Sequence, residues 1–117
     1  MKSVITEIGR NALSESDKML LFFDESATEF IREVSVIQRL ENEEEITVEQ
    51  GDIISFGEQK YNVTEVGAVA NHNLNEIGHV AFLFGKQQEE FAGGIYLEPN
   101  TPPKIEVGME IFYGEEK

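Results

Sequence analysis

Short apolar segments, each separated from the next by glycines or polar residues, are the feature that most limits how this chain can fold. The longest uninterrupted apolar run, Met19–Phe23, has only five residues. Most segments are rich in β-branched or aromatic residues and several alternate with period two, which is typical of strands. We expect strands near residues 4–8, 19–23, 34–39, 46–48, 53–56, 61–66, 80–84, 95–97 and 110–113. Closely spaced strands of this kind predict a mostly β protein, a compact antiparallel barrel or sandwich.

One or two short helices interrupt the expected strands. The first is predicted to begin at Ser26, with Glu29 completing a capping box. Its core-facing residues would be Phe30, Ile31 and Val34. The segment 56–61, which contains Gly57, predicts a hairpin between two strands.

The second helix is expected near residues 72–77. Asn71 would be its N-cap, and Gly78 would end it in the left-handed conformation. Leu74 and Ile77, three positions apart, would form its apolar stripe.

Length and charge limit the classes of function. The 117 residues predict a single domain spanning 1–117. The chain carries 23 acidic and 9 basic residues, a formal net charge of −14, which opposes binding to nucleic acid or to an anionic membrane surface. Cysteine is absent, so disulfides, thiolate metal sites and cysteine nucleophiles are excluded. With no apolar stretch long enough for a signal peptide or a membrane span, the expected location is cytoplasmic.

Two ten-residue segments resemble one another without gaps, residues 48–57 and residues 105–114. Glutamate, two glycines and one isoleucine are identical. Two interpretations compete, the duplication of a β unit and convergence on a turn that leads into a strand. Convergence is favoured at this stage, because ten residues are few.

Candidate chemistry is sparse, and no common cofactor, phosphate-binding or metal motif occurs. The acidic run 41–45 is expected to be a solvated loop, not a cation site. His72 is interpreted as a surface residue in a polar turn. His79 lies at a helix-to-strand junction, where a neutral imidazole can act as a nucleophile or general base. The competing interpretation, favoured from the residue alone, is a structural histidine bonded to a backbone carbonyl.

Two strings are distinctive enough to suggest a family. Residues 61–70 read Y-x-V-T-x-V-G-x-V-A, and residues 73–80 read N-L-x-E-x-G-H-V. The chain resembles the glucitol (sorbitol) IIA component of the bacterial phosphotransferase system along most of its length. The resemblance implies a small, mostly β, cytoplasmic phosphocarrier. Such a protein takes a phosphoryl group from HPr onto a histidine and passes it to the IIB component of a membrane sugar transporter.

The sequence departs from the family at the residue that would carry the phosphoryl group. By resemblance the phosphohistidine position is Gln38, whose amide cannot form a phosphoramidate. His79 is retained in the matching G-H-V, which implies a supporting role or a relocated phosphoryl acceptor. Five acidic residues within 41–49 would repel a phosphoryl group close by and attract a basic partner. Two hypotheses stay open: a phosphocarrier acting through His79 or near Gln38, and a non-catalytic regulatory or binding relative.

Overall fold

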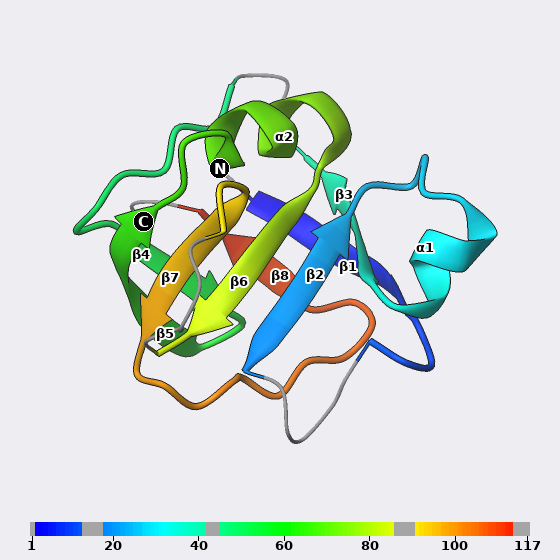
Figure 1. Cartoon of the computed structure of the whole chain (residues 1–117). Helices are drawn as coiled ribbons and strands as arrows, with labels where there is room; N and C mark the ends of the chain where they lie inside the picture. Colours follow the sequence, from blue (N-terminus) through cyan, green and yellow to red (C-terminus); the bar gives the residue numbers. More distant parts are fainter. Residues whose placement is uncertain (1, 13–17, 42–44, 86–90, 114–117) are drawn as a thin grey trace.

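The computed structural model describes residues 2–12, 18–41, 45–85 and 91–113, and these form a closed barrel of eight strands with two short helices (Figure 1). The mostly β barrel predicted from the sequence is therefore confirmed. All but two of the neighbouring strand pairs are antiparallel, the exceptions being β2–β3 and β6–β7. The elements in chain order are β1 (Lys2–Ile8), β2 (Met19–Phe23), α1 (Glu29–Glu33), β3 (Val36–Leu40), β4 (Ile53–Phe56), β5 (Gln59–Val66), α2 (Ala70–Ile77), β6 (Val80–Phe84), β7 (Gly94–Glu98) and β8 (Glu110–Phe112).

The strand expected at residues 46–48 does not form. Ile46 and Val48 are buried as the alternating pattern indicated, but their backbone groups pair with side chains of α2. Asn75 accepts from the Ile46 N–H at 2.7 Å and donates to the Ile46 carbonyl at 2.8 Å. Asn71 likewise accepts from the Val48 N–H at 2.8 Å and donates to the Val48 carbonyl at 3.0 Å. The two side-chain amides thus replace a neighbouring strand, and Asn71 is not the N-cap of the helix.

The first helix is shorter than expected and does not face the core. It begins at Glu29 after Thr28, whose hydroxyl accepts from the Ile31 N–H. Ser26 instead donates to Asp24, so the predicted capping box is wrong. None of the residues of α1 is buried and Phe30 is 77% exposed, because the helix lies beside the barrel and not across it (Figure 1).

The second helix starts earlier than predicted, at Ala70, but ends as predicted. Gly78 adopts the left-handed conformation with φ of 61°, and Leu74 is fully buried. Ile77 is 41% exposed, so it does not extend the apolar stripe. The hairpin between β4 and β5 is confirmed, with Gly57 at a φ of 64° in its two-residue turn.

The barrel has an approximate two-fold symmetry that relates β1, β2, β3 and β4 to β5, β6, β7 and β8. In the order around the barrel, β1-β3-β2-β6-β7-β5-β4-β8, this exchange keeps every pair of neighbours and gives the same closed order read in the opposite direction. The β1–β3 pairing is interrupted by a register shift between Ile5 and Glu7, and the β5–β7 pairing by one between Val63 and Glu65. Each half also contributes one of the two parallel strand pairs. Strand order, direction and irregularity therefore repeat together.

Hydrogen bonds outside the strands repeat in the same way. The N–H of Gly9 bonds to the Ser35 carbonyl, and that of Gly67 bonds to the Gly94 carbonyl, at 2.9 and 2.8 Å. The matching sequences, K-S-V-I-T-E-I-G-R-N-A at 2–12 and K-Y-N-V-T-E-V-G-A-V-A at 60–70, escaped the sequence analysis. The resemblance of 48–57 to 105–114 belongs to this larger repeat, because both segments turn at a glycine and enter the adjacent strands β4 and β8. Convergence on a local turn does not account for a repeat of the whole half-barrel.

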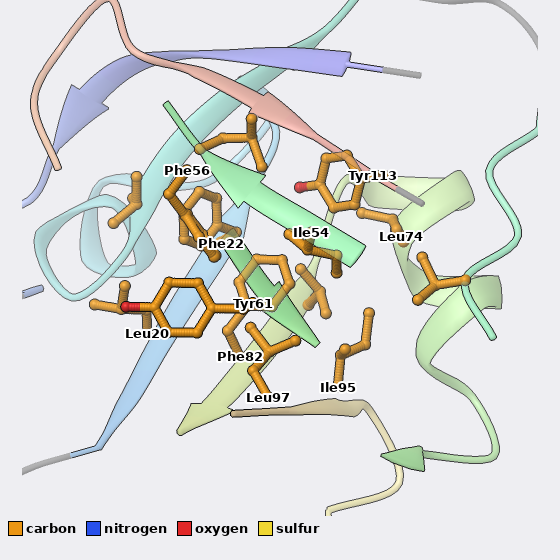
Figure 2. Close-up of a cluster of buried hydrophobic side chains, with 14 of the residues drawn as sticks. Leu20, Phe22, Ile54, Phe56, Tyr61, Leu74, Phe82, Ile95, Leu97 and Tyr113 are labelled. Carbon is orange, nitrogen blue, oxygen red and sulfur yellow. The ribbon is translucent and has the colours of Figure 1, made fainter. Parts of the chain in front are cut away.

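Aromatic and aliphatic side chains together fill the interior (Figure 2). The ring of Phe22 lies edge-on to Phe82 at 5.1 Å between centroids, and Phe82 is edge-on to Phe56 at 5.2 Å. Burying each such side chain stabilises the fold by about 1.5–3 kcal/mol. This packing fixes β2 and β6, the two strands whose ends carry the site described next. No helix in the described part of the chain is long and apolar enough to cross a membrane.

Candidate functional site

His79 lies between the end of α2 and the start of β6, and four contacts hold this junction. Its backbone N–H bonds to the Asn73 carbonyl at 3.2 Å. Its ring stacks on Phe23 with 4.1 Å between centroids and 23° between planes. Its Nδ1 lies 3.1 Å from the carbonyl oxygen of Phe22. The preceding residue, Gly78, accepts a side-chain hydrogen bond from β3.

The Phe22 contact determines where the imidazole can react. A carbonyl oxygen can only accept a hydrogen bond, so Nδ1 carries a proton. In the neutral ring the lone pair then resides on Nε2. The described residues place no hydrogen-bond partner against Nε2, and the side chain is only partly buried. His79 is therefore both the structural histidine of one interpretation and a ring whose remaining nitrogen is available for chemistry.

Gln38 lies inside the barrel wall, with no exposed surface. Its Oε1 accepts from the Ser3 hydroxyl at 2.6 Å and from the Tyr113 hydroxyl, and its Nε2 donates to the Gly78 carbonyl at 2.9 Å. Burial raises the pKa of the Tyr113 hydroxyl, so Tyr113 stays a neutral donor. Three hydrogen bonds thus satisfy most of the hydrogen-bonding capacity of a buried amide.

The structure connects the two residues singled out from the sequence. Gln38 bonds to the carbonyl of Gly78, and Gly78 is the residue before His79. Ser3, Tyr113 and Phe22 complete the arrangement, and the sequence analysis missed all three. A signal for Ser3 was available, because strand alternation puts it on the same inward face as Ile5. A polar residue on such a face requires a buried partner.

A hollow of about 300 Å³ opens beside Gln38. Its lining residues are Asp24, Glu25, Ser26, Gln38, Arg39 and Leu40. Asp24 accepts from the backbone N–H and the hydroxyl of Ser26, and Arg39 pairs with Glu41 at 3.2 Å. A larger hollow of about 590 Å³ lies elsewhere, around Gly57 and Gly108.

The acidic segment after Gln38 is partly described. Glu41 lies 3.2 Å from Arg39 and 4.0 Å from Lys2, so two cations offset its charge. Glu45 and Glu49 are exposed, and residues 42–44 lie outside the described residues. In the described part of the chain, no three His, Asp or Glu side chains come together in a way that could hold a metal ion.

Comparison with known proteins gives one consistent result. Residues 1–112 match the family described as "PTS system glucitol/sorbitol-specific IIA component". Two curated relatives, the glucitol/sorbitol-specific EIIA components of Escherichia coli K12 and Shigella flexneri, are each 36% identical over 109 residues. Each alignment covers 92% of this chain and 88% of the relative. The crystal structure of a PTS IIA component from Enterococcus faecalis V583 superposes with a TM-score of 0.92 at 34% identity, covering 98% of this chain and all of that one.

Proposed function

Because the chain belongs to the family of glucitol/sorbitol-specific IIA components of the phosphotransferase system, we propose that it is a phosphocarrier that uses His79 as its acceptor. It would take the phosphoryl group from HPr and pass it to the IIB component of a hexitol transporter. The observation that supports this choice is the contact of Nδ1 with the Phe22 carbonyl, which leaves the lone pair on Nε2. The cytoplasmic location expected from the sequence stays a prediction.

The transfer can be written with its atoms balanced. The Nε2 lone pair attacks phosphorus, an N–P bond forms at His79, and the N–P bond to the donor histidine of HPr breaks with its electron pair returning to that nitrogen. The His79 ring keeps the Nδ1 proton and gains positive charge. The Phe22 carbonyl, 3.1 Å from Nδ1, would stabilise that charge. In the onward step the phosphoryl group leaves Nε2 for the IIB cysteine, so the protein mainly aligns donor and acceptor.

Gln38 is unsuited to the same step for two reasons. The lone pair of an amide nitrogen is delocalised into the carbonyl, and the whole side chain is buried and hydrogen-bonded. These facts also favour the second candidate, a regulatory or binding relative that keeps the fold and transfers no phosphoryl group. The specific observation for it is that Gln38, which the resemblance places at the phosphohistidine position, is buried and held by three hydrogen bonds within the protein.

A phosphorylation assay separates the two functions. The protein would be incubated with phosphoenolpyruvate, Enzyme I and HPr, and its mass measured under conditions that preserve phosphohistidine. We expect one phosphoryl group on the wild-type chain, none on His79→Ala, and undiminished labelling of His72→Ala, whose side chain is exposed on α2. The Escherichia coli relative is the positive control.

Two results would contradict the phosphocarrier proposal. One is an unlabelled wild-type chain beside a labelled control. The other is labelling that survives His79→Ala. A Gln38→His variant that becomes labelled when the wild type is not would instead support the non-transferring relative.

A further inference from the structure

The two-fold symmetry of the barrel allows each half of the site to be compared with its counterpart. Ser3 pairs with Ile111 across β1–β8 as Tyr61 pairs with Ile54 across β5–β4. Gln38 lies opposite Ile5 across β1–β3, and Leu97 lies opposite Val63 across β5–β7. Gln38 and Leu97 therefore occupy corresponding positions. Tyr113, two residues after Ile111, corresponds to Phe56, two residues after Ile54. Ser3, Gln38 and Tyr113 therefore form one hydrogen-bonded cluster, which we call the polar trio. Tyr61, Leu97 and Phe56, all labelled in Figure 2, occupy the symmetry-related positions, which we call the counterpart cluster.

The counterpart cluster shows that the barrel does not need side chains hydrogen-bonded to one another at these positions. Phe56 packs edge-on to Tyr61 at 5.5 Å, and both belong with Leu97 to the hydrophobic core. Burying three polar side chains contributes less to the stability of the fold than burying apolar ones, because each polar group must replace the hydrogen bonds that it made with water in the unfolded chain. The polar trio is thus a departure from the simpler packing that the same fold uses sixty residues away.

The symmetry also relates two backbone carbonyl groups that have different partners. The carbonyl of Lys18, just before β2, accepts from the Phe84 N–H at 2.8 Å. The symmetry-related carbonyl is that of Gly78, just before β6. The N–H of Asp24 bonds instead to Ile77, at 3.1 Å, because α2 ends there. Gly78 is left to accept from Gln38.

The trio leaves Gln38 one orientation. Since the Gly78 carbonyl can only accept, Nε2 of Gln38 must face it, and Oε1 then accepts from both hydroxyls. We propose that the polar trio is a positioning device for His79. By holding Gly78, it keeps the next residue's ring with Nδ1 at the Phe22 carbonyl, so that the lone pair stays on Nε2. The inference deepens the proposed function, because the ring it positions is the proposed acceptor.

The state of the His79 ring can be measured without any phosphoryl donor. The nitrogen chemical shifts of a ¹⁵N-labelled imidazole distinguish the Nδ1–H from the Nε2–H tautomer, and His72→Ala assigns the signals. Gln38→Leu copies Leu97, and Tyr113→Phe copies Phe56. Tyr61→Phe is the matched control, because it removes a phenol hydroxyl of the counterpart cluster, one that bonds to the Thr101 carbonyl.

We expect the wild type and Tyr61→Phe to show the Nδ1–H tautomer alone. Gln38→Leu should show both tautomers and weakened contacts between the rings of His79 and Phe23. In Tyr113→Phe the tautomer population and the ring contacts should change in the same direction. Transfer from phospho-HPr should be about 10–100-fold slower in Gln38→Leu, the scale of loss for a misplaced reacting group. Folding of each variant is checked by its thermal transition, and Tyr113→Phe decides if Gln38→Leu does not fold.

The inference would be overturned if Gln38→Leu and Tyr113→Phe both fold and both keep the wild-type tautomer of His79 and its wild-type contacts with the ring of Phe23. A wild type that takes no phosphoryl group, with the tautomer still changed by Gln38→Leu, would defeat the proposed function and leave the positioning role in place. The two claims can therefore fail separately.

Discussion

The side-chain amide of Gln38 donates to the carbonyl oxygen of Gly78 at 2.9 Å, joining β3 to the residue that precedes His79. Gln38 and the residue before His79 are therefore neighbours in one hydrogen-bonded network. If Gln38 occupies the phosphohistidine position, as the resemblance of the sequence to the family implies, glutamine there removes a nucleophile and supplies a donor to a carbonyl. The substitution and the geometry of His79 have to be interpreted together.

The buried phenol of Tyr113 predicts a loss of stability at alkaline pH. Burial raises the pKa of its hydroxyl above the ordinary value of 10.0. Above that pH the unfolded chain releases a proton that the folded protein retains. The free energy of unfolding then falls by up to about 1.4 kcal/mol per pH unit from this group. In urea unfolding between pH 9 and 11, the free energy of unfolding of Tyr113→Phe should fall less steeply with pH than that of the wild type.

Ser3→Ala is the control for that series, because it removes a hydrogen bond of the same cluster and no titratable group. It should lower stability at every pH and keep the wild-type slope. Equal slopes in wild type and Tyr113→Phe would show that Tyr113 is not held neutral by burial.

The close approach at Gly67 predicts that a single methyl group is not tolerated there. A Cβ at this position would lie 2.3 Å from the Ala92 carbonyl oxygen, so the backbone would have to move. We expect Gly67→Ala to destabilise the protein by about 1–3 kcal/mol or more, measured by urea unfolding. Gly9→Ala should behave alike, since its Cβ would lie 2.0 Å from the Arg32 carbonyl oxygen.

Gly93→Ala is the matched control, because its Cβ would meet only the side chain of Asn73, at 3.4 Å. A loss for Gly93→Ala as large as that for Gly67→Ala would contradict the steric argument.

The side chain of Asn75 predicts how the segment before β4 is held. Asn75→Ala would leave the N–H and the carbonyl of Ile46 without their partners on α2. Each unsatisfied buried group costs about 1–3 kcal/mol, so the free energy of unfolding should fall measurably. Hydrogen exchange at the Ile46 amide should quicken. Asn62→Ala, at an exposed position of β5, is the control and should change neither quantity. Unchanged exchange at Ile46 would contradict the assignment.

Much of the barrel could be predicted from the sequence, because strand alternation and turn residues are local signals. Gly78 shows this well: a glycine after a short helical pattern ended α2 in the left-handed conformation. Segment 46–48 shows the limit of local signals. Its alternation correctly placed Ile46 and Val48 in the core, but the partners of its backbone, Asn71 and Asn75, lie more than twenty residues away.

The site was only half predictable for the same reason. His79 was identified by its place at a junction, and Gln38 by comparison with a family pattern. Nothing local in the sequence brings Tyr113 to Gln38, since the contact depends on closure of the barrel between β1 and β8. Phe30 was assigned to the core from helical spacing, but α1 is too short and too peripheral to bury it.

The identity of the phosphorylated nitrogen is the most direct test of the site. The ¹⁵N-labelled protein would be phosphorylated through HPr, and phosphorus–nitrogen coupling would assign the bond to a ring atom. The proposed function predicts a single phosphoryl group on Nε2 of His79, with Nδ1 still protonated toward the Phe22 carbonyl. A bond to Nδ1 of His79, a bond to His72, or no phosphoryl group where the Escherichia coli relative is labelled would contradict it.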